Sequence, residues 1–138
     1  MPMTPPMPLN RRRLLAGSLA GCLPLWQPAL ASTTWRVGPG EALTRVADAL
    51  QQAQDCDTIA VLPGTYRGDV AVIRQRRLHI VGLGERPVLH ADGQHAEGKA
   101  IWVVRDGEIT VENIAFRGAR VPDHNGAGIR FERGHLVL

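Results

Sequence analysis

The fold of this chain is decided by the stretch Ile101-Trp102-Val103-Val104-Arg105-Asp106-Gly107-Glu108-Ile109-Thr110-Val111. Moved forward until Gly107 falls on Gly134, the stretch covers positions 128–138, and Ile109 and Val111 meet the apolar Leu136 and Leu138. Moved back until Ile109 falls on Leu78, it covers positions 70–80 with the same agreement. A unit repeated in this way is typical of a solenoid, in which each strand hydrogen-bonds to its counterpart in the next coil.

The two displacements differ in length. We call the one that relates Leu78 to Ile109 the longer offset, and the one that relates Gly107 to Gly134 the shorter offset. A change of offset between coils indicates that the connections between strands differ in length.

A tight corner is predicted once in each coil. The apolar alternation runs up to Val111 and resumes at Ile114 one position out of step. Such a slip turns every later side chain to the other face unless the backbone bends. We place the bend at Glu112-Asn113, because asparagine enters the left-handed region at low cost. Gly82 has the equivalent position one coil earlier and suits the same corner.

One short amphipathic helix is predicted before the coils. Its apolar residues follow the spacing of a single helix face, namely Leu43, Val46, Ala47, Leu50 and Ala53. The helix is followed by an apolar strand, Thr58-Ile59-Ala60-Val61-Leu62, which the Pro63-Gly64 turn closes.

These features resemble the opening of right-handed parallel β-helix proteins of the pectate-lyase-like group. The resemblance is carried by Val37-Gly38-Pro39-Gly40, the helix, and the segment from Asp57 to Tyr66, and it extends over positions 35–138. It implies an all-β fold, a right-handed parallel β-helix (solenoid) with a short N-terminal capping α-helix. Many members of this group are exported proteins that cleave, epimerise or bind polysaccharides, especially uronates.

The C-terminal end of the sequence limits what can be predicted about activity. The chain ends within the apolar strand Leu136-Val137-Leu138, so we expect the solenoid to be incomplete there. The groove of the resembled family lies on later coils, and no catalytic residue is transferred. We therefore expect the N-terminal part of a polysaccharide-acting protein of lyase or epimerase type. The alternatives are a non-catalytic carbohydrate-binding or surface protein and a truncated fragment without independent activity.

Residues 1–31 are predicted to form an export signal, and residues 32–138 the cap and first coils. Arg11-Arg12-Arg13 precedes a short apolar run, and Ala29-Leu30-Ala31 provides a small-residue cleavage site. The pattern resembles a twin-arginine signal, with an ordinary secretory signal as the alternative. It predicts the twin-arginine export machinery as a partner and a periplasmic or secreted protein. The run is too short and too interrupted to form a stable membrane span.

A lipid-anchored form is the alternative to cleavage after Ala31. Leu19-Ala20-Gly21-Cys22 resembles the lipobox of bacterial lipoproteins, in which the cysteine is lipidated and becomes the new N-terminus. Cys22 is therefore a candidate lipidation site.

Net charge does not indicate a nucleic-acid partner. The whole chain has a formal net charge of +3, with 16 lysines and arginines and 13 acidic residues. Arg11, Arg12 and Arg13 account for that excess, so the mature part is balanced. A basic face is the electrostatic requirement for nucleic-acid binding, and we predict no nucleic-acid partner.

Asp92 and Asp123 are the candidate metal ligands. The longer offset places them at equivalent positions of adjacent coils, about 4.8 Å apart, where two carboxylates can share a cation such as Ca²⁺. His95 and His124 lie close to them in sequence and are candidate proton carriers at a substrate site. The alternative is that both segments are polar turns, because Asp, Asn and Gly are also turn residues.

Arg74, Arg76 and Arg77 form a predicted basic corner suited to an acidic polysaccharide, because guanidinium groups bind carboxylates in bidentate fashion. The alternative is a solvated turn. Trp102 lies between two residues that we expect to face inward, so it is predicted to face outward and to stack on a sugar ring. Packing beneath a loop is the alternative for Trp102.

Overall fold

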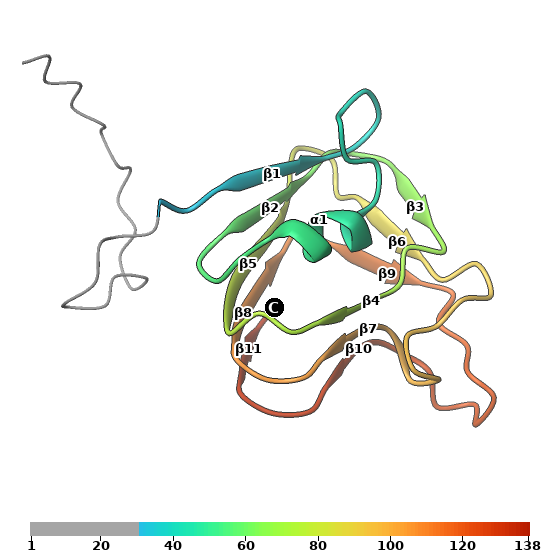
Figure 1. Ribbon diagram of the computed structural model, residues 1–138. Coiled ribbons are helices and arrows are strands. Elements are labelled where there is room, and N and C mark those ends of the chain that lie inside the picture. The colour runs from blue at the N-terminus through green and yellow to red at the C-terminus, as the bar shows by residue number, and fades with distance from the viewer. Residues whose placement is uncertain (1–30) are drawn as a thin grey trace, which may run out of the picture. The chain divides into compact units, whose positions relative to one another are not determined.

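The computed structural model describes residues 31–138 (Figure 1). The arginines of the predicted export signal, and Cys22 with its alternative lipidation, lie outside the described residues. The export signal and the lipid anchor therefore stay predictions.

The described residues form a parallel β-solenoid of about four turns with three sheets. Sheet A has the order β1 (Thr34–Val37), β2 (Thr58–Val61), β5 (Arg77–Gly82), β8 (Glu108–Glu112), β11 (His135–Val137). Sheet B has the order β3 (Thr65–Arg67), β6 (Val88–His90), β9 (Ala115–Arg117). Sheet C has the order β4 (Ala71–Ile73), β7 (Ala100–Val104), β10 (Ala127–Phe131).

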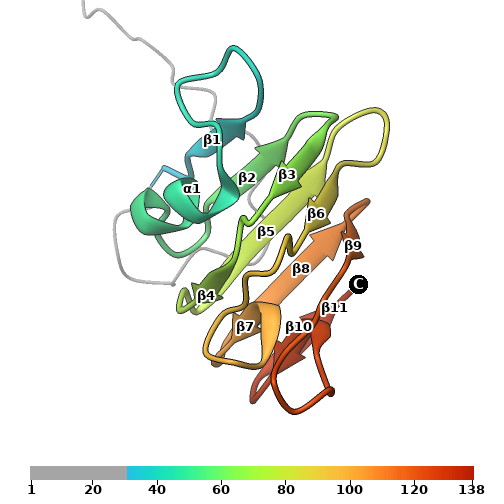
Figure 2. The same cartoon turned by 90° about the vertical axis from the view of Figure 1, so that its right-hand side faces the viewer.

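All strand pairs within these sheets are parallel, because the chain visits sheets A, B and C in turn and then returns to sheet A one level further on. Figure 1 looks along the solenoid, with sheets A, B and C as three sides, and Figure 2 shows the coils stacked. The predicted fold class, an all-β parallel β-helix with one short helix, is confirmed. Right-handed winding is the hand that parallel crossovers strongly favour.

The predicted register is confirmed for sheets A and C. Leu78 pairs with Ile109 and Val72 with Val103, which is the longer offset. Leu136 pairs with Ile109, which is the shorter offset. The alternation of the sequence therefore identified the correct neighbours within these two sheets.

The corner after β8 also lies where it was predicted. Asn113 has a φ of 54°, and its side-chain Nδ2 donates to the carbonyl of Gly82 at 2.9 Å. Gly82 does not have a positive φ, but a Cβ at this position would collide with the Asn113 carbonyl oxygen. Gly82 is thus required by the close approach of two coils rather than by its own backbone conformation.

The corner after β5 is longer, and this changes the register of sheet B. Residues 83–87 separate β5 from β6, whereas only residues 113–114 separate β8 from β9. As a result His90 pairs with Arg117, which is the shorter offset rather than the longer one. The longer offset is valid between β5 and β8 and does not continue into sheet B.

Helix α1 (Val46–Gln52) covers the N-terminal end of the coils. Its buried residues are Val46, Ala49 and Leu50, so the predicted helix is confirmed but its inward face was partly wrong. Leu43 lies before the helix and forms a bridge with Val37, and Ala47 is only half-buried. The helix begins later than the periodicity indicated, which rotates the buried face.

Side chains from the coils fix both ends of α1. The buried Asp69 carboxylate accepts hydrogen bonds from the backbone N–H groups of Val46 (2.6 Å) and Ala47 (2.9 Å). At the other end, Gln75 Nε2 donates to the carbonyl oxygens of Leu50 and Ala53. Unpaired backbone groups at helix ends are costly when buried, so these contacts attach the cap to the first coil.

Candidate functional site

The outer face of sheet B carries one basic residue on each strand. Side chains alternate between the two faces of a strand, so Tyr66, Leu89 and Phe116 stack inward, in register. Their neighbours on the outer face also pair with one another, and we call them the basic column: Arg67, His90 and Arg117. Neighbouring strands are about 4.8 Å apart, so the column is a compact row of basic groups.

The middle residue of the basic column has a defined orientation. His90 Nδ1 accepts a hydrogen bond from the backbone N–H of Asp92 at 3.0 Å, so the neutral ring has its proton on Nε2. The imidazole lies directly over Gly118, where an added Cβ would come within 2.9 Å of the ring. Since no side chain occupies position 118, the ring can rest on the backbone of the next coil.

Carboxylates balance the basic column only weakly. Asp92 lies 3.8 Å from Arg67, and both side chains are more than half exposed. Exposed pairs at that distance contribute little. Among residues 31–138 no carboxylate forms an ion pair with Arg117. The column therefore presents positive charge to solvent.

A hollow of about 230 Å³ adjoins the N-terminal end of the basic column. Arg67 belongs to both features. The hollow lies between β3 and the segment before α1, and its lining includes Thr44, Arg45, Thr65, Tyr66 and Asp69. Arg45 is held at the rim, because its Nη2 donates to the carbonyl of Gly68 at 3.0 Å.

Two buried groups form the inner wall of this hollow. The Tyr66 hydroxyl donates to the carbonyl of Leu62 at 2.7 Å, and burial followed by the nearby Asp69 raises its pKa. Burial also raises the pKa of Asp69, although its hydrogen bonds from two backbone N–H groups and the charge of Arg45 oppose that shift. Both side chains have their polar atoms engaged by the fold, so they support the wall.

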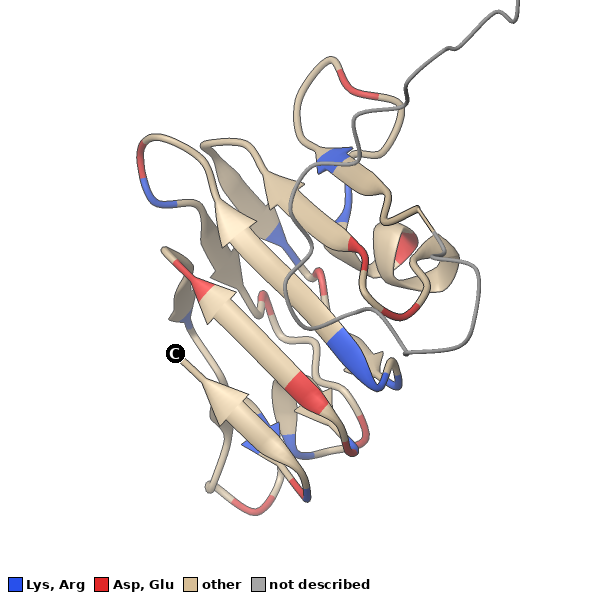
Figure 3. Cartoon of the chain, turned by 90° about the vertical axis from the view of Figure 1, so that its left-hand side faces the viewer, with Lys and Arg blue, Asp and Glu red and all other residues tan. Residues whose placement is uncertain are grey.

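Sheet A presents a different outer face (Figure 3). Arg77 Nε donates to Glu108 at 2.9 Å, across the β5 and β8 strands. His79 Nε2 lies 2.6 Å from a Glu112 carboxylate oxygen, further along the same two strands. Basic and acidic residues therefore face each other on neighbouring strands, so these side chains are paired within the protein.

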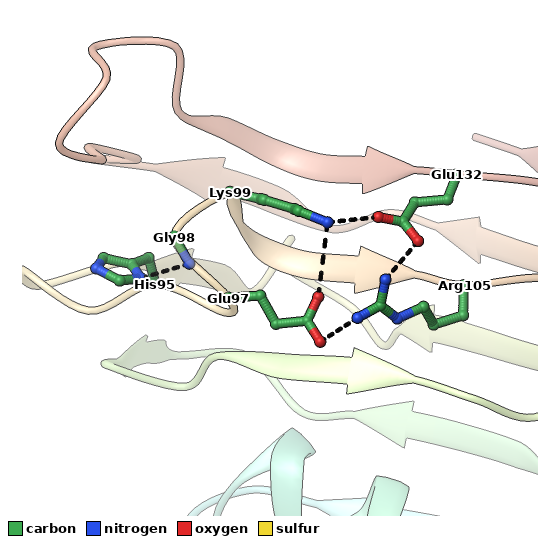
Figure 4. A network of polar contacts seen from close by, with 6 residues as sticks. All are labelled: His95, Glu97, Gly98, Lys99, Arg105 and Glu132. Atoms are coloured by element: carbon green, nitrogen blue, oxygen red, sulfur yellow. Dashed lines mark hydrogen bonds and ion pairs between the residues drawn. The ribbon is translucent and has the colours of Figure 1, made fainter.

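A third charged group is a network beside sheet C (Figure 4). Glu132 accepts from Lys99 at 2.7 Å and from Arg105 at 2.6 Å, and Glu97 also pairs with Arg105. The hydrogen bond from Lys99, followed by that from Arg105, lowers the pKa of Glu132 to about 2. Hydrogen bonding to Glu132 raises the pKa of Arg105. The two cations are thus engaged within the protein.

The prediction for Trp102 was wrong. Its side chain is fully buried, pairs in register with Ala71 and Ile129, and meets Phe116 edge to face at 4.9 Å. The outward position belongs to Val103, which is covered by Ala96. Because β7 is buried on both faces, its sequence shows no alternation that distinguishes them. Trp102 is a core residue and cannot contact a sugar.

The prediction of a shared cation at Asp92 and Asp123 was also wrong. With the shorter offset of sheet B, Asp92 is level with position 119, and Asp123 is not its counterpart. Both lie in turns, and Asp92 has a φ of 47°. Calcium takes about six to eight oxygen ligands. Within residues 31–138 no group of three or more acidic, histidine or cysteine side chains is arranged to hold a metal ion, so the residues present do not fit Ca²⁺.

The predicted histidines lie in separate turns. His95 Nδ1 accepts from the backbone N–H of Gly98 at 2.9 Å, and His124 has a φ of 60°. Both side chains are exposed. No described contact brings them together, and a role in substrate binding stays a prediction.

The predicted basic corner is divided among different environments. Arg77 faces Glu108 on sheet A, and the backbone N–H of Arg76 donates to Asp55 at 2.7 Å. Arg74 borders a separate hollow of about 530 Å³ between α1 and β4, whose other lining residues are mostly small and apolar. The three guanidinium groups do not form one surface by any described contact. Their role in binding also stays a prediction.

Sequence reasoning missed the basic column because of the corner at residues 83–87. The shorter offset relates His90 to Arg117, and this signal was available once the offset was allowed to change at the corner. Arg67 was harder to find, since its distance along the chain to His90 matches neither offset.

Comparison with known proteins gave no match: no family model fits the chain, and no curated protein or solved structure is significantly similar to it. Within the described part of the chain, no helix has the length and apolar composition that a membrane crossing requires.

Proposed function

We propose that this chain is an exported β-helix protein of the pectate-lyase-like type that binds acidic polysaccharides on the outer face of sheet B. The observation that carries the proposal is the basic column. Arg67, His90 and Arg117 are in register on three adjacent strands, and they lack the close facing carboxylates that the cations of sheet A have.

The chemistry of the column suits a repeating anion. A guanidinium group binds a carboxylate through two parallel hydrogen bonds, and here two of them flank a ring that donates from Nε2. A polymer with one carboxylate per sugar offers several such groups in a row. The strand pairing fixes the spacing of the three residues before binding, which reduces the entropy cost of association.

Binding is the function that these residues support best. Cleavage or epimerisation stays a prediction of the sequence. The two are distinguished by turnover, because a lyase generates new unsaturated chain ends whereas a binding protein leaves the polymer unchanged.

The test is isothermal titration calorimetry of the full chain with polygalacturonate and alginate, with neutral dextran as the control polymer. We expect saturable binding to the acidic polymers only. Arg117→Glu should lower the affinity about 100-fold, since it removes one charge-assisted contact and adds a repulsive one.

The matched control is Arg130→Gln, which removes an exposed arginine on β10 of sheet C. It should change the affinity less than about twofold, because charges outside the contact area act only through weak, screened interactions. Equal binding of dextran and polygalacturonate, or an Arg117→Glu protein that binds like the parent, would refute the proposal.

A further inference from the structure

The hollow at the N-terminal end of the basic column has hydrogen-bond donors that the fold leaves free. The backbone N–H of Val88 donates to Gly64, and that of Gly68 donates to His90. Residues of a parallel strand alternate in the side to which their backbone groups point. The N–H groups of Thr65 and Arg67 therefore point away from β6, toward the hollow, and no described backbone hydrogen bond engages them.

The side chains at the hollow are also mainly donors. Arg45 uses one of its five N–H groups for Gly68, and Arg67 is more than half exposed. Thr44 and Thr65 add hydroxyl groups. The one carboxylate in the lining, Asp69, accepts from two backbone N–H groups of α1 and is buried. An anion entering the hollow meets two cations and several N–H and O–H donors.

The size of the hollow limits what it can hold. Pockets for drug-sized ligands measure about 300–1,000 Å³, and this one measures about 230 Å³. It has room for one sugar ring but not for an oligomer. The segment before α1 closes one side, so a polymer that runs along sheet B ends here.

We infer that this hollow holds the terminal carboxylated sugar of a chain bound along the basic column. The inference rests on the proposed function and extends it, because it assigns a chain end to one end of the column. Arg45 and Arg67 bind the carboxylate, and the threonine hydroxyls and free backbone N–H groups contact the ring oxygens.

The test compares a short chain with a long one. Hexagalacturonate has an end on every molecule, whereas long polygalacturonate binds mostly through interior sugars. Arg45→Gln in the full chain should weaken hexagalacturonate binding about tenfold, the loss of one charge-assisted contact. It should change the binding of the long polymer less than about twofold. Free galacturonate, but not galactose, should compete with the hexamer.

A second variant guards against a change in fold, since Arg45 also contacts Gly68. Thr65→Val removes one hydroxyl from an exposed position of β3 and retains the branched shape. It should weaken the hexamer about threefold with an unchanged melting temperature. Arg36→Gln is the matched control, because Arg36 lies on β1, paired with Glu41, and does not line the hollow.

The outcomes separate this inference from the proposed function. If Arg45→Gln weakens the hexamer and the polymer equally, or weakens neither, there is no chain-end site, while the effect of Arg117→Glu still supports the column. If galactose competes as well as galacturonate, the hollow does not recognise a carboxylate. If the parent protein binds neither saccharide, the proposed function itself is wrong.

Discussion

Sheets A and B are built from the same coils, yet the charged residues on their outer faces are arranged differently. On sheet A, Arg77 meets Glu108 and His79 meets Glu112, so a basic residue faces an acidic one in each pair. On sheet B, three basic residues follow one another over three strands. A solenoid that maintains such a stack on one face, while neutralising another, supports our proposal that sheet B meets an external anion.

The largest expected effect comes from removing core packing beneath sheet B, where Trp102 meets Phe116. Trp102→Ala should lower the free energy of unfolding by about 3–5 kcal/mol, as truncation of a buried aromatic residue does. Trp102→Phe should cost far less, because the indole Nε1 is buried without a hydrogen-bond partner among the described residues and so loses nothing polar. Urea unfolding followed by circular dichroism measures both.

The same pair of variants separates a core role from a binding role. If Trp102 contacted a saccharide, the alanine variant would lose affinity and retain stability. We expect the opposite for the fraction of the protein that stays folded, since the side chain is fully buried.

The second prediction concerns variants in which the basic residues of sheet A, like those of sheet B, have no close facing carboxylate. In a protein that already has Arg117→Glu, the further changes Glu108→Gln and Glu112→Gln remove the carboxylates that face Arg77 and His79. We expect polygalacturonate affinity to rise about threefold over Arg117→Glu alone, because the carboxylates that compete with the polymer for Arg77 and His79 are removed. Calorimetry with the same polymer measures the change.

The stability cost of this exchange should be below about 1 kcal/mol, because the pairs on sheet A are exposed. Glu85→Gln in the exposed corner after β5 is the matched control and should not change the affinity. If the sheet A variant gains no affinity, pairing of charges is not what distinguishes the two faces.

The smallest expected effect concerns the network beside sheet C. As on sheet A, basic and acidic side chains of this network pair with each other. The pKa of Glu132 is about 2, below its ordinary value of 4.5, so the folded state favours the ionised carboxylate. Its contribution to stability is complete above about pH 4.5 and is lost as the pH falls toward 2. Glu132→Gln should therefore flatten the decline of the melting temperature in this range.

Thermal melts of the parent and of Glu132→Gln between those two pH values measure the effect, with Glu85→Gln again as the control. The two proteins should approach each other at the acid end, where protonation removes the charge of Glu132 in the parent. Superimposable profiles over the whole range would show that the network does not stabilise the fold.

Most of the fold was predictable because strands with one solvent-exposed face show an alternation of apolar and polar residues. The pairing of Leu78 with Ile109 and the corner at Asn113 both follow from that alternation. Prediction failed where the alternation is absent. β7 is buried on both faces, so Trp102 was assigned to the wrong one.

The site was less predictable than the fold, because it depends on register across a corner. Residues 83–87 have no apolar alternation that would reveal extra length, and the offset valid before the corner was applied after it. The result was a pairing of Asp92 with Asp123 that the strands do not make. The true pairing of His90 with Arg117 is the one that creates the column.

The corner after β5 also allows one part of a coil to change in length without disturbing its neighbours. It is longer than the corner after β8, yet β5 stays aligned with β8 and β6 stays aligned with β9. The contact between Gly82 and Asn113 anchors the point from which the longer loop departs. Segments of other lengths can therefore be grafted within positions 83–87, provided that the contacts of Leu83 with Val61 and of Arg86 with Asn113 are kept.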